Sequence, residues 1–294
     1  MEKLTATKIC SIVALVIFLV DLFFNAAAMF PGPLLALFFN NNAIATAAAF
    51  LPSAITPSRW VFFIWILIYF YQLAWIVFAL IIAFSKKTCI VPLGSYVGFI
   101  FASVFNFIWL ITYAFNQIVS SFIIIFLLFA SITFAAYWGS IYIGRCSHEE
   151  MCRKTKFILH IIFLNGLFLY WAWIVVAMHL VLDNVFVYSG VPVFTSGAVV
   201  LAILLAFQIA AFVVDLLVLR KAMINVLVVF PTFMVALVAM ITEAGPLFLT
   251  LPGEIVGLII TNLIVSITFF LVKIFRAVRH KRSHHGISHV SNKA

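Results

Sequence analysis

The sequence predicts an all-α protein, a polytopic transmembrane helical bundle of about eight spans. Of its 294 residues, 67% are hydrophobic and only 9% are charged, whereas a soluble domain carries about 25% charged residues. The apolar runs are continuous, whereas the strands of a membrane barrel alternate polar and apolar residues. Helices are then the elements that satisfy their own backbone hydrogen bonds in lipid.

Eight stretches have the roughly 20 apolar residues that crossing the hydrocarbon requires. Charged residues or turn-forming Gly, Pro and Asn residues separate them, so each stretch is predicted to be a separate helix. In chain order, the predicted spans are Ile9–Phe30, Trp60–Phe84, Leu93–Phe115, Ile118–Ile143, Phe157–Leu182, Ser196–Leu219, Met223–Thr242 and Ile255–Val278.

The segment Pro31–Ser58 is apolar, but several prolines and the Asn40–Asn42 run interrupt it. Basic residues decide whether it is a ninth span, because short cytoplasmic loops collect Lys and Arg. With eight spans and cytoplasmic termini, all 17 basic residues except Arg59 lie on the cytoplasmic side, and a ninth span would divide them. We therefore predict an outer loop or re-entrant cap here. The net charge of +9 has the same cause and does not indicate nucleic-acid binding.

The first span leaves one alternative open. Its basic start, apolar stretch and Ala26–Ala28 resemble a secretory signal with a small-residue cleavage site. Cleavage would leave a seven-span, receptor-like protein. Asp21 and Asn25 are unfavourable in the apolar region of a signal, which favours an intact span. The chain also lacks the Asp-Arg-Tyr and Asn-Pro-x-x-Tyr motifs of rhodopsin-like receptors.

The cysteines and the C-terminal tail give weak functional signals. Cys10, Cys89, Cys146 and Cys152 are predicted near the cytoplasmic side, where disulfides are rare. The loop CSHEEMC is open to three interpretations: free thiols, an acylated cysteine, or zinc, for which a second ligand pair is missing. We predict no metal and no cofactor. The tail, residues 280–294, mixes basic residues with histidines, so it either contacts anionic lipid or only marks topology.

Aromatic residues gather at the start of the second span, in ITPSRWVFFIWILIYFYQLAW. Their spacings of three, four and seven predict that much of the set forms a stripe along one helical flank. Thr56 suits the N-cap of this helix and Pro57 its first position. The members of the stripe are Trp60, Phe62, Trp65, Tyr69, Gln72 and Trp75.

The motif Thr56-Pro57, Trp60-x-Phe62, Trp65 and Tyr69 resembles the second helix of the tryptophan-rich sensory protein family, also called the translocator protein (TspO) family. Two further motifs support the resemblance. The third span carries Asn106 and Trp109 in the family's Asn-x-x-Trp pattern. The fifth carries a Tyr-x-x-Trp-x-x-x-Ala pattern at Tyr170, Trp173 and Ala177.

The resemblance covers residues 1–182, which implies a five-helix unit with the apolar outer loop 31–58. Residues 183–279 are then three additional helices, as in longer relatives, and residues 280–294 are a basic cytoplasmic tail. The chain departs from the family pattern at Leu169, where proline is frequent, and at Leu180-Val181, where Leu-Asn is common. The resemblance implies non-enzymatic binding, with transport as an extension, of a small hydrophobic ligand such as a tetrapyrrole or a sterol.

The topology places the three motifs together in the outer halves of their helices. Under the apolar loop, their rings predict an aromatic ligand pocket with few polar anchors; simple helix packing is the alternative. Tyr69, Gln72 and Asn106 are the candidates for hydrogen bonds to the ligand, and Arg59 for pairing with a ligand carboxylate. The complete set of predicted binding residues is Arg59, Trp60, Phe62, Trp65, Tyr69, Gln72, Asn106, Trp109, Tyr170 and Trp173.

Polar residues inside the spans are costly and often functional. Asp21 is predicted to face the bundle interior together with Asn25, and is the functional candidate among them. Asp215 is expected to form an interfacial pair with Arg220 and Lys221.

His160 and Asn165 are expected to bond neighbouring helices. The scattered acids give little support to the remaining alternative, an intramembrane enzyme. The small residues Ala26–Ala28 suit packing within or between chains, so a homodimer stays open.

Overall fold

The structure is a computed structural model that describes residues 2–29, 37–39, 51–85, 90–145, 153–220 and 222–291, with side chains described at all of these except residues 3, 29, 153 and 281–291. The described residues form helices and contain no strand. Eight helices among them are long and apolar enough to cross a membrane. The predicted all-α fold with eight spans is therefore confirmed, and the chain is a multi-pass membrane protein.

Each observed span lies at the predicted place, with ends shifted by a few residues. The helices are α1 (Glu2–Met29), η1 (Arg59–Phe63), α4 (Ile64–Ser85), α5 (Leu93–Ala114), α6 (Ile118–Arg145), α7 (Arg153–Ile158), η2 (Leu159–Leu164), α8 (Asn165–Tyr188), α9 (Val193–Leu217), η3 (Met223–Asn225), α10 (Val229–Ala244), η4 (Gly245–Thr250) and α11 (Gly253–Ser291).

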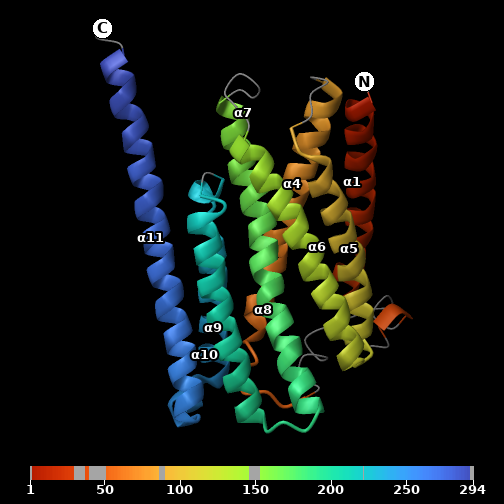
Figure 1. The fold of residues 1–294 in the computed structure, drawn as a ribbon. Helices are drawn as coiled ribbons and strands as arrows, with labels where there is room; N and C mark the ends of the chain where they lie inside the picture. The colour runs from red at the N-terminus through yellow and green to blue at the C-terminus, as the bar shows by residue number, and fades with distance from the viewer. Residues whose placement is uncertain are drawn as a thin grey trace.

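The helices run up and down along one common direction, and both ends of the chain lie at the same end of the bundle (Figure 1). We call this end the terminal end. Helix α8 lies at the centre of the bundle: 83% of the most apolar 18-residue stretch of its span is buried, compared with 22% for α11. It packs against α4, α6, α9 and α10. Helices α1, α5 and α6 lie on one side of it, and α9, α10 and α11 on the other (Figure 1).

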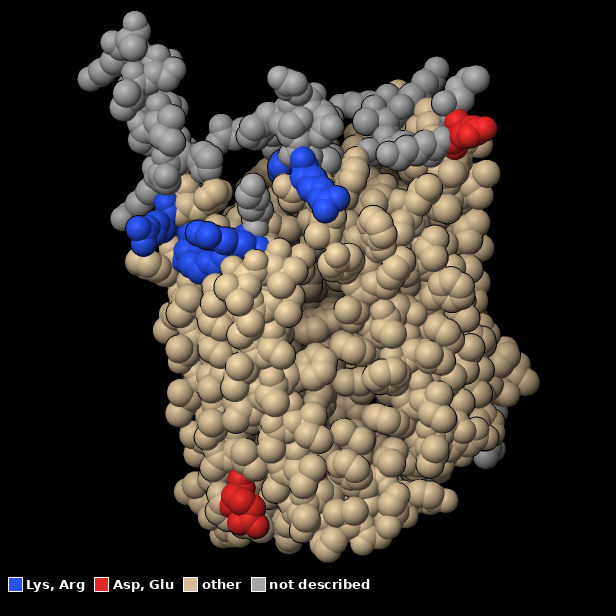
Figure 2. Space-filling view, viewed as in Figure 1, with Lys and Arg blue, Asp and Glu red and all other residues tan. Residues whose placement is uncertain are grey.

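The surface of the bundle is that of a membrane protein. On the face shown in Figure 2, Lys and Arg gather at the terminal end, above a broad belt without charged residues. The exposed large hydrophobic side chains of α1, α4, α6 and α11 belong to such a belt. Exposed described cations at the terminal end are Arg145, Lys154, Arg220 and Arg279, while Arg59 is exposed at the opposite end.

The start of the second span differs from the prediction. The helix begins as a 3-10 turn at Arg59, with Ser58 at the cap position, so Thr56 is not the N-cap. The reason is a tertiary contact: the Ser58 amide donates to the carbonyl of Ala239 in α10, at 3.0 Å. The backbone of Ser58 is therefore held against α10, and the helix begins only after it.

Helix α8 is preceded by the π-helical turn η2, where Asn165 acts as a structural bridge. Its amide donates to the carbonyls of His160 (2.7 Å) and Asn225 (3.0 Å), and its oxygen accepts from the Leu227 amide (3.0 Å). The expectation that Asn165 bonds a neighbouring segment is confirmed. His160 is buried, but its Nδ1 has no hydrogen-bond partner among the described residues.

Helices α9 and α11 are joined by two buried polar groups. Gln208 donates to Asn262 and accepts from Ser266, at 2.8 and 2.6 Å. Nearer the terminal end, Asp215 forms an ion pair with Lys273. Among the described residues Asp215 pairs with residues of α11 and not with Arg220, so the predicted pairing with Arg220 is wrong. Lys221, the other predicted partner, lies outside the described residues.

Helix α1 is an integral part of the bundle. It packs against α4 and α5, and Ala27 and Ala28 are buried within the chain. Asp21 and Asn25 are both buried and face each other, as predicted, with the Asn25 amide donating to Asp21 Oδ1 at 2.9 Å.

Several predictions concern residues outside the described part. They include most of the segment 31–58, the loop 146–152 with two of the cysteines, and the tail side chains. Cys89 and Lys221 also lie outside it. The fourth cysteine, Cys10, is a free thiol in α1.

Candidate functional site

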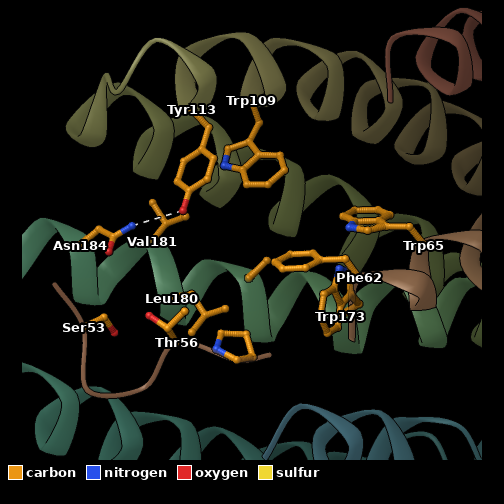
Figure 3. Close-up of a pocket in the computed structure, with 12 residues that line it drawn as sticks. Ser53, Thr56, Phe62, Trp65, Trp109, Tyr113, Trp173, Leu180, Val181 and Asn184 are labelled. Carbon is orange, nitrogen blue, oxygen red and sulfur yellow. Dashed lines mark hydrogen bonds between the residues drawn. The ribbon is translucent and has the colours of Figure 1, made fainter. Parts of the chain in front are cut away.

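A cavity lies in the half of the bundle opposite the terminal end, between α4, α5, α8 and the segment 51–58 (Figure 3). Each element contributes one side: η1 and the first turn of α4 supply one wall, the last turns of α5 a second, and the half of α8 away from the terminal end the floor. The lining residues are Ser53, Thr56, Pro57, Phe62, Trp65, Trp109, Tyr113, Trp173, Ala177, Leu180, Val181 and Asn184.

Five of the twelve residues that line the cavity are aromatic, and several of their rings contact one another. Trp173 lies at the centre, with ring centroids 6.3 Å from Trp65 and 6.2 Å from Phe62 at interplanar angles of 86° and 89°. On the α5 side, Trp109 and Tyr113 stack at 5.1 Å. The indole N–H groups of Trp109 and Trp173 are buried and have no acceptor among the described residues. Buried indoles normally find a partner, so these two donors are free for a bound molecule.

The opposite end of the cavity is polar. Tyr113 and Asn184 approach each other there, with the Asn184 amide donating to the Tyr113 hydroxyl at 3.3 Å (Figure 3). Ser53 and Thr56 face the same end from the extended segment. The cavity therefore has an aromatic end near Trp65 and a hydroxyl- and amide-lined end near Asn184.

The segment 51–58 covers the cavity and is held by α9 and α10. Besides the Ser58 amide bond to α10, the Ser58 hydroxyl bonds the Thr242 hydroxyl, and Trp60 Nε1 donates to the same oxygen, both at 3.1 Å. Gly197 of α9 lies against the segment so closely that an added Cβ would be 3.2 Å from Ala54 Cβ. The cover of the cavity thus depends on α9 and α10.

The cavity is small in this conformation, at about 40 Å³. A cavity needs about 10–15 Å³ to hold one water molecule, so this space fits a few waters. A drug-sized ligand needs about 300–1,000 Å³. A ligand of that size enters only if the rings and the segment 51–58 move apart.

The structure brings four of the ten predicted binding residues to the cavity, namely Phe62, Trp65, Trp109 and Trp173. Trp60 is turned outward and is 44% exposed, because the 3-10 turn takes it off the stripe. Arg59 is exposed and does not line the cavity. The other predicted residues that lie elsewhere are Tyr69, Gln72, Asn106 and Tyr170.

These four residues are buried beyond the cavity wall, and two of them are engaged by the protein. Gln72 donates to the Gly166 carbonyl at 2.9 Å and accepts from Trp75 Nε1 at 2.7 Å. Asn106 donates to both carboxylate oxygens of Asp21, at 2.9 and 3.1 Å. Tyr69 stacks on Trp65, with centroids 5.3 Å apart.

Sequence reasoning missed the polar end of the cavity. Tyr113 lies one helical turn after Trp109, so the α5 motif could have been extended to it. Asn184 lies two turns after Ala177 on the same face, but beyond residue 182, where the family resemblance ended. Ser53 and Thr56 belong to the outer loop that was predicted to cover the pocket, but its sequence has no periodicity that would single them out as lining residues.

The chemistry of the lining suits binding. No Asp, Glu, His or Cys is among the residues that line the cavity. Across the described part of the chain, no group of three or more His, Cys, Asp or Glu is placed to hold a metal ion.

Comparison with known proteins agrees with this arrangement. The sequence model of the family described as TSPO-like protein matches residues 11–275. The match therefore extends over all eight spans, well beyond the 182 residues of the resemblance. Comparisons with curated proteins and with solved structures gave no match. With most of its length and its three aromatic motifs accounted for, the chain belongs to the TSPO-like protein family.

Proposed function

We propose that the protein binds a small, hydrophobic, planar ligand in the aromatic cavity, and that transfer of this ligand to and from the bilayer is an extension of that binding. The observation that carries the proposal is the convergence of Phe62, Trp65, Trp109 and Trp173, from three helices, on one cavity. Aromatic walls with a few convergent polar groups are the usual composition of a ligand site.

The lining favours an uncharged ring system. Flat rings can stack on Trp65 and Trp109, and the two unpaired indole N–H groups can donate to a ligand oxygen. A single hydroxyl or keto group would meet Tyr113 and Asn184 at the polar end. Of the two ligand classes that the family resemblance implies, a sterol fits this distribution better than a tetrapyrrole, because no cation lines the cavity to pair with carboxylates.

We propose that the terminal end faces the cytoplasm. The described cations gather there (Figure 2), and such asymmetry marks the cytoplasmic side. The same cations, together with the basic C-terminal segment, are then placed to attract anionic lipid, at about 1 kcal/mol per cation near the surface. The orientation puts the cavity in the outer half of the bilayer.

The alternatives receive less support from the structure. A seven-span receptor requires the loss of α1, yet α1 supplies Asp21, which accepts two hydrogen bonds from Asn106. An intramembrane enzyme requires an acid, a base or a nucleophile at the site. Apart from three indoles, the polar side chains that line the cavity carry only hydroxyl or amide groups. We also propose the division into a five-helix unit, three further helices and a tail.

The proposal is tested by ligand titration of the protein in lipid nanodiscs. Fluorescent sterol and porphyrin are titrated separately into the wild type, Trp65→Ala and Trp173→Ala, with Trp138→Ala as the matched control. Trp138 is 43% exposed on α6 and does not line the cavity. Ligand fluorescence is followed, so that the loss of one tryptophan does not alter the signal itself.

We expect saturable binding to the wild type and to Trp138→Ala. Loss of either cavity indole should weaken binding about tenfold or more, since central aromatic residues typically carry 2 kcal/mol or more of the binding energy. Equal affinities for the cavity variants, the control and the wild type would refute the pocket.

A further inference from the structure

Asp21 is an acidic residue buried in the membrane region, and no described Lys or Arg forms an ion pair with it. It is 2% exposed and lies in the first span. The ion pairs in the described part of the chain involve Asp215 and not Asp21. The sequence has no Lys or Arg between Lys8 and Arg59, and neither of these is near the middle of the helix. Ionisable groups at such depth are costly and are normally paired.

The carboxylate belongs to a cluster whose hydrogen bonds are incomplete. Its oxygens accept from the amides of Asn25 and Asn106, through three contacts of 2.9 to 3.1 Å. A carboxylate offers about four acceptor positions, so one remains. The hydroxyls of Tyr69 and Tyr170 and the Asn106 side-chain oxygen are buried and have no hydrogen-bond partner among the described residues.

Tyr69 of α4 and Tyr170 of α8 belong to the same buried region, because the ring of Trp65 contacts both tyrosine rings. Both hydroxyls are within electrostatic range of the Asp21 carboxyl group. The cluster thus brings together polar side chains of four helices, α1, α4, α5 and α8. Its oxygen atoms without a hydrogen-bond partner, on Asn106, Tyr69 and Tyr170, together with the Asp21 carboxyl group, can accept hydrogen bonds from an ammonium group.

Trp65 connects this cluster with the cavity. Its ring lines the cavity and stacks on Tyr69 at 5.3 Å with an interplanar angle of 20°. The same ring meets Tyr170 edge to face at 6.0 Å. In Figure 3, Trp65 lies at the end of the cavity opposite the polar residues Asn184 and Ser53. A side-chain rotation of Trp65 would join the cavity to the cluster.

We propose that Asp21, Asn106, Tyr69 and Tyr170 form a cation-accepting subsite behind Trp65, and that it selects planar ligands bearing a protonated amine over neutral or anionic ones. The inference rests on the proposed function, because the ring system of such a ligand occupies the aromatic cavity. Its ammonium group then donates to the free acceptor position of Asp21 and to the Asn106 oxygen. The aromatic rings around the path also favour a cation over an anion.

The test uses three probes that share one ring system: 1-pyrenemethylamine, 1-pyrenemethanol and 1-pyrenecarboxylate. Each is titrated into nanodiscs of neutral lipid that hold the wild type, Asp21→Asn or Trp65→Ala, and energy transfer from tryptophan to pyrene is recorded. Asp21→Asn keeps the size and polarity of the side chain and removes its charge. Empty nanodiscs give the partitioning of each probe into lipid, which is subtracted.

We expect the amine to bind the wild type about tenfold more tightly than the alcohol, because charge-assisted hydrogen bonds are roughly twice as strong as neutral ones. The carboxylate should bind most weakly. In Asp21→Asn the amine should lose its advantage while the alcohol keeps its affinity. If Asp21→Asn does not fold, the order of the affinities of the three probes for the wild type still tests the subsite.

Equal binding of amine and alcohol to the wild type would overturn the subsite, as would an amine preference that survives in Asp21→Asn. In either case, alcohol binding that Trp65→Ala abolishes would leave the aromatic pocket standing. Absence of saturable binding for all three probes would overturn both proposals. Competition of Na⁺ with the amine would assign the subsite to cations in general.

Discussion

The buried ion pair between α9 and α11 predicts a strong, non-additive effect on stability. Lys273 and Asp215 side chains are 1% and 3% exposed. Lys273 also donates to the Met223 carbonyl at 2.8 Å. Removing one partner of a buried pair costs about 3–5 kcal/mol, because the other charge stays buried without its main partner. We use the low end, about 3 kcal/mol, since Arg276 still contacts Asp215 when Lys273 is replaced and helices unfolded in a micelle find other polar partners.

The variants are Asp215→Leu, Lys273→Met and the double variant. Each single change should lower the free energy of unfolding by about 3 kcal/mol. The double variant leaves no buried charge from the pair and replaces it with apolar groups, which is often close to neutral. We therefore expect a loss near 1 kcal/mol instead of the additive 6, which corresponds to a coupling of about 5 kcal/mol.

Unfolding is measured as loss of far-UV circular dichroism during titration of dodecylmaltoside micelles with sodium dodecyl sulfate. Arg276→Met is the matched control, because Arg276 is 20% exposed and its contact with Asp215 is longer, at 3.4 Å. Its loss should cost less than about 1 kcal/mol. Additivity of the two single changes within about 0.5 kcal/mol would refute the reasoning, since it would mean that the two charges do not depend on each other.

Two further predictions concern close helix contacts. Gly98→Leu should destabilise the bundle by about 2 kcal/mol or more, because an added Cβ would lie 2.7 Å from backbone atoms of Ala135 and Ser131 in α6. The same unfolding titration measures this loss. Gly257→Leu is the control, because an added Cβ at Gly257 meets open space. Gly197→Val should push the segment 51–58 away from α9 and raise the rate of sterol-probe association in stopped-flow fluorescence, while Gly257→Val leaves it unchanged. An unaltered rate for Gly197→Val would mean that the segment does not limit access.

The number and places of the spans could be predicted from the sequence, because length and hydropathy alone decide whether a helix crosses lipid. The interior position of Asp21 was predictable because an ionisable side chain is costly in contact with lipid. What failed was local detail set by tertiary contacts. Thr56 has the chemistry of an N-cap, yet the helix starts later because Ser58 bonds Ala239, more than 180 residues away in sequence.

The candidate site was predicted in outline and missed in part. Periodicity correctly placed Trp65, Trp109 and Trp173 on inward faces, since one face of a helix is fixed by its 3.6-residue period. Periodicity could not distinguish a cavity wall from a packed second layer. Asn106 and Gln72 were expected to bond a ligand, but they bond Asp21 and Gly166, partners from other helices that a single sequence does not reveal.

Because the cavity is closed, the contacts of α9 and α10 with its cover bear on the proposed ligand binding. About 40 Å³ of space cannot hold a fused-ring ligand, so binding must separate the segment 51–58 from the α4, α5 and α8 walls. That separation breaks the contacts of Ser58 and Trp60 with Thr242 and shifts the segment from Gly197. Each neutral hydrogen bond contributes about 0.5–1.5 kcal/mol, so α9 and α10 set the cost of opening. The apparent affinity for a ligand equals the affinity of the open state multiplied by the fraction of molecules that are open. On the proposed function, α9 and α10 therefore influence binding although none of their residues lines the cavity.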